Sequence, residues 1–452
     1  MKLHLVSLGC ARNQVDSEMM LGRLRERGWE ITGEPGAAEV IVVNTCSFIE
    51  AAANESIDTI LTLAAFKQTG VCRRLIVAGC LPERYREQIV ASLPEVDLFL
   101  GTGAYDQIEK GVEDLMGKRA CELPDPNRTE LATAHLPRMI TEPHSAYLKI
   151  AEGCSSRCTY CIIPKLRGNH RSRPMADITA EARKLFNAGV REIVLVAQDT
   201  THYGKDLSPP VDLNQLLLQL SDLSQDVWIR FLYGHPSRMD TVLIKTVAAR
   251  SNICSYFDIP IQHASDRLLK RMGRPYSRED LIRIFDTIRT LAPNASLRTT
   301  AIVGFPGETE ADVEALVSLM EKIRFDHLGV FTYSDADDLP SHRLSGHVSG
   351  KVAEARRAYL MGRQQEISRK NNERYLGQTL SVLVEEAAEE HLFIGRHAGQ
   401  APEVDGITYI HVKSPHCMIK TGIFTSVRII DTLEYDLVGE TLDPVTEYVK
   451  DT

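Results

Sequence analysis

Residues 153–161 read Gly153-Cys154-Ser155-Ser156-Arg157-Cys158-Thr159-Tyr160-Cys161, which places three cysteines in a C-x3-C-x2-C spacing. This stretch directly follows an apolar run that predicts a strand over residues 147–152. Three thiolates on one loop can bind three irons of a 4Fe–4S cluster. The fourth iron then has no protein ligand, so it can accept a small molecule.

Zinc is the alternative metal for this stretch. A structural zinc site usually has four protein ligands, and no fourth cysteine lies nearby in the sequence. His170 is a candidate, but it lies in a basic loop over residues 167–173, which favours a solvated histidine. A disulfide would leave one of the three thiols over. The spacing therefore favours an iron–sulfur cluster over zinc.

The cysteine stretch opens a series of six predicted strand–helix units. Strands are expected over residues 147–152, 192–198, 228–233, 256–261, 296–304 and 327–333, and helices near 176–188, 212–224, 239–249, 277–291 and 308–323. Six units predict an open, partial barrel, because a closed barrel of parallel strands and helices has eight. A long polar helix is expected next, over about residues 351–376.

A second set of cysteines follows three predicted strands near the N-terminus. The apolar runs Leu3–Leu8, Val40–Val43 and Leu75–Ala78 predict buried parallel strands, and Cys10, Cys46 and Cys80 come just after them. In open α/β sheets, ligands bind outside the carboxyl ends of the strands. We therefore expect the three thiols to converge. Three unrelated buried thiols are the alternative, since free cysteine is often buried.

The other four cysteines, Cys72, Cys121, Cys254 and Cys417, have no partner spacing and are predicted to be structural thiols. Composition supports a globular chain, with 43% apolar and 25% charged residues among 452. No apolar run approaches the ~20 residues of a membrane span. The N-terminus lacks the apolar segment and cleavage site of a signal peptide, so a cytoplasmic location without membrane contact is expected.

The order of predicted elements divides the chain into three domains. Residues 1–118 are expected to form the N-terminal open α/β domain, residues 144–376 the central partial barrel, and residues 377–447 a small antiparallel β-barrel. Residues 119–143 contain four prolines and no helical or strand period, so they are predicted to be a linker.

The spacing of the three cysteines, with an aromatic residue before the last one and six strand–helix units after it, resembles the radical S-adenosylmethionine superfamily. In that superfamily the open iron binds S-adenosylmethionine, and an electron from the cluster releases a 5′-deoxyadenosyl radical. The resemblance implies that Cys154, Cys158 and Cys161 bind the cluster. It also implies that Tyr160 lies near the adenine, although ordinary packing would explain this residue equally well.

Two further residues are expected at the cofactor site, Gly304 by the same resemblance and Gln198 by its position at a strand end. Gly304 lies in Ile302–Glu308, a segment similar to the one that lines the adenosyl pocket in the superfamily. A plain turn between a strand and a helix is the alternative for Gly304. Gln198 ends the second strand of the central domain and is expected to contact cofactor or substrate.

The second cysteine set and the C-terminal barrel extend the resemblance to the methylthiotransferase family, over essentially the whole chain. The resemblance implies that Cys10, Cys46 and Cys80 bind a second 4Fe–4S cluster with one open iron, which would deliver sulfur. The C-terminal barrel is similar to the TRAM module of that family. The implied cofactors are thus two 4Fe–4S clusters and S-adenosylmethionine.

Three strings of sequence resemble one branch of this family, which adds a methylthio group to the β-carbon of an aspartate in a small-subunit ribosomal protein (S twelve). They are residues 6–18, 44–49 and 193–201, and residues 147–153 look similar as well. The tRNA branch opens with an aromatic–Gly–Cys–Gln–Met–Asn type of motif, whereas this chain has Leu8, Ala11 and Arg12. Asp335–Pro340 departs from the expected Glu–Gly–Thr type of loop. A tRNA adenosine methylthiotransferase remains the alternative, and a non-catalytic redox protein a remote one.

Charge bears on the partner of the C-terminal barrel. Residues 377–452 hold 13 Asp/Glu and 5 Lys/Arg, so they account for −8 of the net charge of −9. Phosphate contacts dominate the affinity of nucleic-acid-binding domains, so direct nucleic acid binding is not expected. An acidic surface suits a basic ribosomal protein as docked substrate; a solvated acidic face without a partner is the alternative. An electron donor is a further expected partner.

Overall fold

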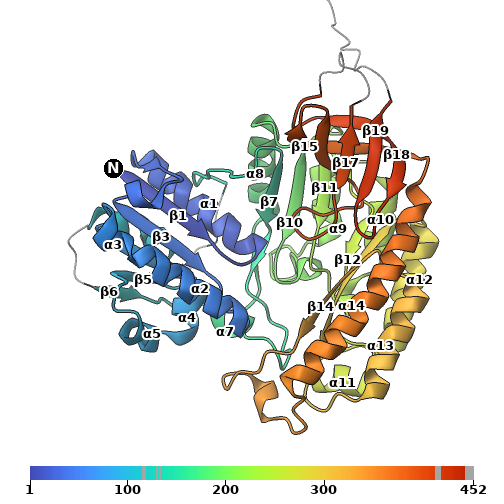
Figure 1. The fold of residues 1–452 in the computed structure, drawn as a ribbon, viewed down its shortest axis with the longest axis horizontal. Helices are drawn as coiled ribbons and strands as arrows, with labels where there is room; N and C mark the ends of the chain where they lie inside the picture. The colour runs from blue at the N-terminus through green and yellow to red at the C-terminus, as the bar shows by residue number, and fades with distance from the viewer. Residues whose placement is uncertain (115–118, 129–130, 132–133, 413–418, 443–452) are drawn as a thin grey trace, which may run out of the picture.

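The computed structural model describes residues 1–114, 119–128, 131, 134–412 and 419–442. Figure 1 shows three bodies in chain order: an N-terminal α/β domain (blue), a central domain (green to orange) and a C-terminal β-barrel (red). None of the described helices is both long and apolar enough to cross a membrane. The observed order of strands and helices matches the predicted order of the three domains.

The N-terminal domain is a parallel sheet with helices around it. Its six strands lie in the order β2 (Glu30–Ile31), β1 (Lys2–Ser7), β3 (Val40–Thr45), β4 (Arg74–Gly79), β5 (Leu98–Leu100) and β6 (Ala120–Glu122). The helices are α1 (Ala11–Glu26), α2 (Glu50–Ala64), α3 (Phe66–Thr69), α4 (Cys80–Tyr85), α5 (Glu87–Ser92) and α6 (Ile108–Glu113). Strands β3 and β4 are buried along their whole length, which explains their continuous apolar runs.

Strand β6 differs from the sequence-based expectation, which assigned residues 119–143 to a linker. Ala120, Cys121 and Glu122 pair in parallel with Leu98–Leu100 and add an edge strand to the N-terminal sheet. Three residues are too short to show an alternating pattern, so the pairing comes from the neighbouring strand and not from a local signal. The N-terminal sheet therefore extends beyond residue 118.

The central domain is a six-stranded, open half-barrel. Its strands form two parallel sheets, β7 (Ser145–Lys149), β10 (Glu192–Val196) and β11 (Trp228–Phe231), then β12 (Tyr256–Asp258), β13 (Ser296–Val303) and β14 (His327–Thr332). A bridge between Ile229 and Ile253 joins the two sheets. The helices are α7 (Ile163–Arg167), α8 (Met175–Asn187), α9 (Leu213–Ser221), α10 (Thr241–Ala249), α11 (Asp266–Arg271), α12 (Arg278–Leu291), α13 (Glu310–Ile323) and α14 (Gly350–Asn372), and β8 (Ala151–Glu152) pairs with β9 (Arg171–Ser172).

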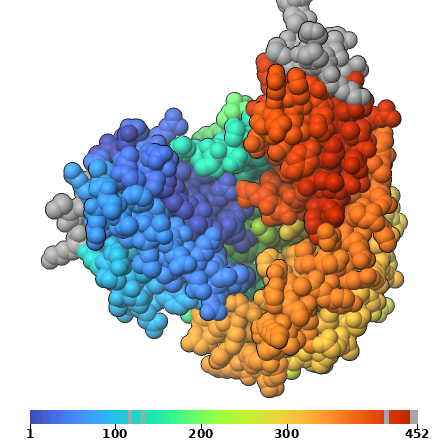
Figure 2. All heavy atoms as spheres, in the orientation of Figure 1, coloured from blue at the N-terminus to red at the C-terminus, as the bar shows by residue number. Residues whose placement is uncertain are grey.

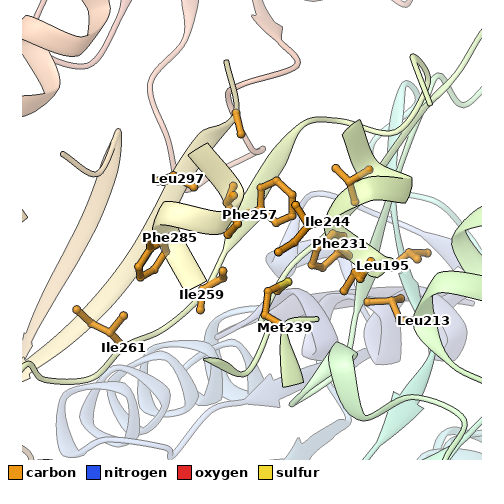
Figure 3. Close-up of a cluster of buried hydrophobic side chains, with 14 of the residues drawn as sticks. Leu195, Leu213, Phe231, Met239, Ile244, Phe257, Ile259, Ile261, Phe285 and Leu297 are labelled. Atoms are coloured by element: carbon orange, nitrogen blue, oxygen red, sulfur yellow. The ribbon is translucent and has the colours of Figure 1, made fainter. Parts of the chain in front are cut away.

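The main hydrophobic core lies between these strands and their helices. Figure 3 shows Leu195, Phe231 and Phe257 of successive strands packed beside Ile244 of α10 and Phe285 of α12. Successive strand residues point to opposite faces, so only alternate residues reach this core. The others point to the concave face of the half-barrel, which needs a different cover.

Two other domains cover the concave face. Val194, Trp228 and Tyr256 point there and pack in one buried cluster with Val15 of α1 and Leu383 of the C-terminal barrel. A partial barrel leaves this apolar face open, so its burial depends on segments that are distant in the sequence. All three domains therefore meet at the concave face.

The C-terminal barrel closes in the strand order β15 (Thr379–Glu389), β16 (Leu392–His397), β17 (Thr408–His411), β19 (Leu437–Thr441) and β18 (Phe424–Thr432). Four of the five pairings are antiparallel, as expected, but β17 and β19 are parallel. Closure forces this exception, because the barrel has an odd number of strands. Cys417 and residues 443–447 of the predicted domain lie outside the described residues.

Candidate active site between the N-terminal and central domains

The N-terminal cysteines follow the carboxyl ends of three neighbouring parallel strands. Strands β1, β3 and β4 are adjacent, and Ser7, Asn44 and Ala78 lie in register across them. Cys10, Cys46 and Cys80 follow within three residues, and we call them the strand-end trio. Strands β1 and β3 are neighbours although β2 lies between them in the chain, so this edge is a topological switch point, where open α/β sheets bind ligands.

Buried polar side chains tie the three strand ends together. Asn13 Nδ2 donates to the carbonyl oxygens of Leu8 and Thr45, each at 2.9 Å. Thr45 Oγ1 donates to the Ala78 carbonyl at 2.6 Å, and Ser47 Oγ donates to the Cys80 carbonyl at 2.9 Å. These bonds satisfy backbone groups that the strands leave unpaired at their ends. They hold the loops that carry the thiols in one arrangement.

The second set, Cys154, Cys158 and Cys161, lies on the loop between β8 and α7, and we call it the loop trio. The backbone amide of Cys154 donates to the Gly168 carbonyl at 3.0 Å. Arg274 Nη1 donates to Cys158 Sγ at 3.3 Å, and the Ser156 amide to Cys154 Sγ at 3.4 Å. All six thiols of the two trios are free, as cluster ligands must be.

The two trios face the same junction. Cys80 packs in one hydrophobic cluster with Ile162, the residue after Cys161, and with Leu166. The positive charge of Arg12 acts on both sets, because it favours the thiolate forms of Cys10 and Cys161 and so opposes the effect of burial on both pKa values. At Cys10 the effect of the neighbouring cations is larger than that of burial, so the pKa of this thiol is lowered. At Cys161 the effect of burial is larger, and it raises the pKa to about 12.

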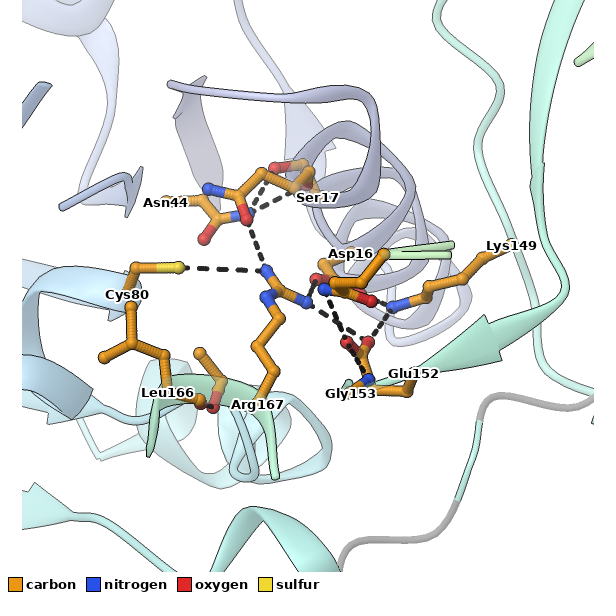
Figure 4. A network of polar contacts seen from close by, with 12 residues as sticks. Asp16, Ser17, Asn44, Cys80, Lys149, Glu152, Gly153, Leu166 and Arg167 are labelled. Carbon is orange, nitrogen blue, oxygen red and sulfur yellow. Dashed lines mark hydrogen bonds and ion pairs between the residues drawn. The ribbon is translucent and has the colours of Figure 1, made fainter. Parts of the chain in front are cut away.

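A buried charge network crosses the junction beside the trios (Figure 4). Arg167, at the end of α7, pairs with Asp16 of α1 at 3.0 Å and with Glu152 at 3.1 Å, and Lys149 also pairs with both carboxylates. Arg167 Nη2 also lies 4.0 Å from Cys80 Sγ. The two cations balance the two carboxylates. The network thus links the loop trio's domain to the strand-end trio.

Most of the basic loop of residues 167–173 is buried, His170 included, so the expectation of a solvated His170 is wrong. Side chains of Arg167 and Arg173 are only 2% and 3% exposed, because they pair with carboxylates. The His170 ring contacts Ser172 Oγ at 3.1 Å and packs against His202. Its pKa is lowered to about 4, chiefly by burial. Ser172 and Asp177 are close in the sequence, but Asp16, Glu152 and His202 come from separate segments, which the sequence could not show.

The other predicted site residues lie near the loop trio. Gln198 Nε2 is 3.4 Å from Glu152 Oε1, while Gln198 Oε1 is buried without a partner, as expected for a group that binds a ligand. Tyr160 packs near Met272 and Phe305. Gly304 has φ +76°, and a Cβ there would lie 2.4 Å from the Cβ of Ala353 in α14. The close approach of α14 therefore gives Gly304 a packing role.

The thiols suit iron–sulfur clusters better than a single metal ion. Among the residues that the structure describes, no group of three His, Cys, Asp or Glu side chains is close enough to hold one ion. A cluster needs only one thiolate at each of three irons, so its ligands can lie farther apart. Arg12, Arg167 and Arg274 place positive charge beside the thiols, which favours the anionic ligands of a cluster.

A cavity of about 570 Å³ lies at the same domain boundary. Its lining includes Arg167, Glu152 and Lys149 of the network and Tyr105 of the N-terminal domain, but none of the six cysteines. The hollow that Figure 2 shows between the N-terminal domain (blue) and the orange part of the chain is a different one, because the lining of this cavity comes only from residues 16–173. The charge network thus separates this cavity from the thiols.

Several residues that shape the site carried no prediction. The thiols are contacted or influenced by three arginines, Arg12, Arg167 and Arg274. The one local signal for them was that the charged residue Arg12 stands two positions after Cys10. Asp338, in the loop that departs from the family pattern, pairs with Arg84 at 2.9 Å and so joins this loop to the N-terminal domain. Leu339 of that loop packs beside Cys80.

Three family models match the three bodies in order. Residues 2–101 match the uncharacterized protein family UPF0004, residues 148–320 the radical SAM superfamily, and residues 376–442 the TRAM domain. The matches fall within the N-terminal domain, the half-barrel and the closed barrel described above. The fold of the central domain is thus that of the radical SAM superfamily.

Solved structures of two radical S-adenosylmethionine enzymes share the fold. The methyltransferase TsrM from Kitasatospora setae matches with a TM-score of 0.57 at 13% identity, over 81% of this chain and 89% of the other. The cobalamin-dependent enzyme OxsB matches with a TM-score of 0.51 at 14% identity, over 81% of this chain and 56% of the other. At such identities the likeness concerns the fold alone.

Curated relatives match nearly the whole chain. The ribosomal protein uS12 methylthiotransferase RimO of Desulfosudis oleivorans is 53% identical over 97% of this chain and 100% of its own length. The protein of the same name from Clostridioides difficile is 47% identical over 98% and 99%. The chain therefore belongs to the RimO family of radical S-adenosylmethionine methylthiotransferases.

Proposed function

We propose that this enzyme adds a methylthio group to the β-carbon of an aspartate in ribosomal protein uS12. Near full-length identity to uS12 methylthiotransferases supports the substrate. One structural observation carries the chemistry: thiol trios from two different domains meet at one junction, where Cys80 packs against Ile162 and Arg12 acts on both trios.

The enzyme uses two 4Fe–4S clusters and S-adenosylmethionine, as its family does. When bound, these groups supply the electron, the radical and the sulfur for the reaction. The loop trio would hold the cluster that accepts S-adenosylmethionine, and the strand-end trio the cluster that delivers sulfur.

The chain's own residues position these ligands and exclude water. Arg274 donates to Cys158 and holds that end of the loop trio. Leu166 and Leu339 bury Cys80, and Glu152 keeps Gln198 beside the start of the loop. A site closed by two domains suits a reactive carbon radical, because it prevents side reactions with solvent.

The acidic C-terminal barrel is our proposed docking surface for uS12. Glu386, Glu389 and Glu390 are exposed at the β15–β16 hairpin. Two other acidic residues of the barrel are paired, Glu385 with Arg396 of the barrel and Asp405 with Arg298 of the central domain. The hairpin therefore offers exposed negative charge to a basic protein. We propose that the reaction takes place in the cytoplasm with a separate electron donor.

The direct test is an anaerobic assay with reconstituted enzyme, S-adenosylmethionine, a strong reductant and purified uS12. We expect mass spectrometry of uS12 peptides to show one aspartate in which a methylthio group replaces one hydrogen. A parallel reaction with tRNA should leave every nucleoside unmodified. Modified adenosine with unmodified uS12 would overturn the proposal, and so would a complete lack of 5′-deoxyadenosine.

Docking by the barrel is tested separately. We expect replacement of Glu386, Glu389 and Glu390 by lysine to weaken uS12 binding, with a smaller dependence on salt, because exposed charges are screened by ions. Replacement of Glu354, Glu366 and Glu373 on exposed parts of α14 and the turn after it reverses the same charge elsewhere and serves as the control. Equal effects of both triple variants would contradict a specific role for the hairpin.

A further inference from the structure

Arg12 lies between the two thiol trios. It is the second residue of α1, two positions after Cys10, yet its side chain reaches into the central domain. Its Nη1 donates to the carbonyl of Ala197 at 2.9 Å, and its Cζ lies 4.9 Å from the ring centre of Tyr233. Ala197 and Tyr233 follow strands β10 and β11 at their carboxyl ends, where the half-barrel opens.

Arg12 has no carboxylate partner among the residues that the structure describes. Its one hydrogen bond goes to Ala197, and its Nε is buried without any acceptor. Nearby Arg167 instead pairs with Asp16 and Glu152. A guanidinium has five N–H donors and stays charged at any working pH. The Arg12 side chain is partly buried and its charge has no carboxylate beside it, which is costly, so this position is suited to an anion.

The orientation of Arg12 is fixed before any ligand binds. Tyr233 holds the guanidinium plane from one side, and Tyr233 itself has φ +61°, a left-handed backbone conformation that non-glycine residues rarely adopt. The Tyr233 amide donates to Asp258 Oδ2 at 2.8 Å, which holds the residue there. Strained residues of this kind occur at binding sites, where surrounding contacts maintain them.

Two anions could meet Arg12: the thiolate of Cys10 or a group of the substrate. A thiolate is a single acceptor, whereas a carboxylate accepts two parallel hydrogen bonds from the planar guanidinium. We propose that Arg12 binds the carboxylate of the substrate aspartate and thereby holds its β-carbon between the strand-end trio and the loop trio. This inference rests on the proposed function, because it assigns the recognition of that aspartate.

The test measures binding without turnover. The reconstituted enzyme, with S-adenosylmethionine and without reductant, is titrated calorimetrically with a uS12 peptide that carries either the target aspartate or asparagine. We expect the wild type to bind the aspartate peptide roughly tenfold to a hundredfold more tightly, as for hydrogen bonds to charged groups. Arg12→Met should remove this preference and leave the affinity for the asparagine peptide unchanged. Arg12→Lys should keep part of the preference, because it retains the charge without the planar fork.

Arg25→Met is the matched control, since Arg25 is an exposed arginine on the same helix. It should retain the full preference for aspartate. If Arg12→Met weakens both peptides equally, or still prefers aspartate, the inference is wrong while the proposed function can stand. If Arg12→Met loses iron but keeps the preference, Arg12 serves only the cluster and the inference also fails. A wild type that binds and modifies neither peptide would overturn the proposed function as well.

Discussion

The loop trio and the strand-end trio each bring three thiols together, but they do so in different ways. Cys154, Cys158 and Cys161 lie in one short loop, so their spacing alone brings them together. The strand-end trio comes from three separate strands and meets only because β1, β3 and β4 are neighbours in register. One set therefore depends on local sequence, and the other depends on the packing of a whole domain.

Their surroundings differ as well. In the loop trio Arg274 is the hydrogen-bond donor to Cys158. In the strand-end trio, Arg12 and Arg167 both oppose the effect of burial on Cys10 and Cys46. At Cys80 burial raises the pKa to about 12, and Arg167 opposes it. Arg167 belongs to the central domain, so the strand-end trio requires the docked domain as well as its own sheet. The strand-end trio should therefore be the more sensitive to changes elsewhere in the fold.

The largest effect should come from removing one thiol of each trio. We expect Cys158→Ala to lose about half of the roughly eight irons and all formation of 5′-deoxyadenosine. Cys46→Ala should lose the same share of iron, keep 5′-deoxyadenosine formation and lose methylthio transfer. Iron analysis and chromatography of the products measure both. Cys72→Ala, which removes a buried thiol of the same N-terminal domain, should retain all of the iron. Equal product profiles for the first two variants would contradict a division of labour.

A change at the domain junction should affect stability next most strongly. Arg167→Met leaves Asp16 and Glu152 buried with one cation fewer, which we expect to cost about 3–5 kcal/mol of unfolding free energy. Iron loss should be confined to the cluster of the strand-end trio. Chemical unfolding and iron analysis measure these effects. Lys165→Met, on the same helix but half exposed beside Asp338, should cost less than about 1 kcal/mol. Similar losses for both variants would argue against the network.

A smaller effect should follow from crowding a strand end. Gly79 has φ +99°, and a Cβ there would lie 2.6 Å from the Thr45 carbonyl oxygen, next to Cys46. We expect Gly79→Ala to cost about 1–3 kcal/mol and to reduce iron at the strand-end trio. Gly153→Ala should instead disturb the loop trio, since its Cβ would lie 2.1 Å from the Asn169 carbonyl oxygen.

Gly362→Ala is the control for both glycine variants, because Gly362 lies in a helix with nothing within 4 Å of the new Cβ. It should stabilise the protein slightly, since alanine favours helices more than glycine does. Chemical unfolding and electron paramagnetic resonance of each reduced variant would separate the two clusters. Loss of the same cluster signal in Gly79→Ala and Gly153→Ala would contradict the independence of the trios.

The smallest effect is a loss of stability at acidic pH, and it comes from a histidine outside both trios. Burial lowers the pKa of His397 to about 3, against about 6.5 in an unfolded chain. Above pH 6.5 the histidine is neutral in both states and its contribution to stability is complete. As pH falls toward 3, the unfolded state binds the proton first, so stability is lost. We expect about 1 kcal/mol less stability at pH 5.5 than at pH 7.5 from this group.

Chemical unfolding of the cluster-free protein at both pH values measures this loss. His397→Gln should show a correspondingly shallower dependence on pH, whereas substitution of the exposed His411 should leave it unchanged. An unaltered pH dependence in His397→Gln would show that other groups cause the acid sensitivity.

Local patterns predicted most of the elements. Apolar runs located β3 and β4, because strands buried on both faces must be apolar throughout. The strand-end rule for open sheets predicted that Cys10, Cys46 and Cys80 converge, and the structure brings them to one edge. The patterns failed where a partner is distant: β6 pairs only because β5 lies beside it, and His170 is buried because its basic loop finds carboxylates in other segments.

The amino-acid sequence by itself determined the two sets of three thiols, the order of the three domains and the family. The two cysteine sets and the order of the domains follow from residue spacing and periodicity, whereas the family follows from the resemblance of these motifs to those of known proteins. Only the tertiary structure decided that Arg12 lies between the trios without a carboxylate partner among the residues described, and that Arg167 of the central domain reaches Cys80 of the N-terminal domain. The physical reason is that the concave face of an open half-barrel must be buried by distant segments, and that burial selects which charges meet.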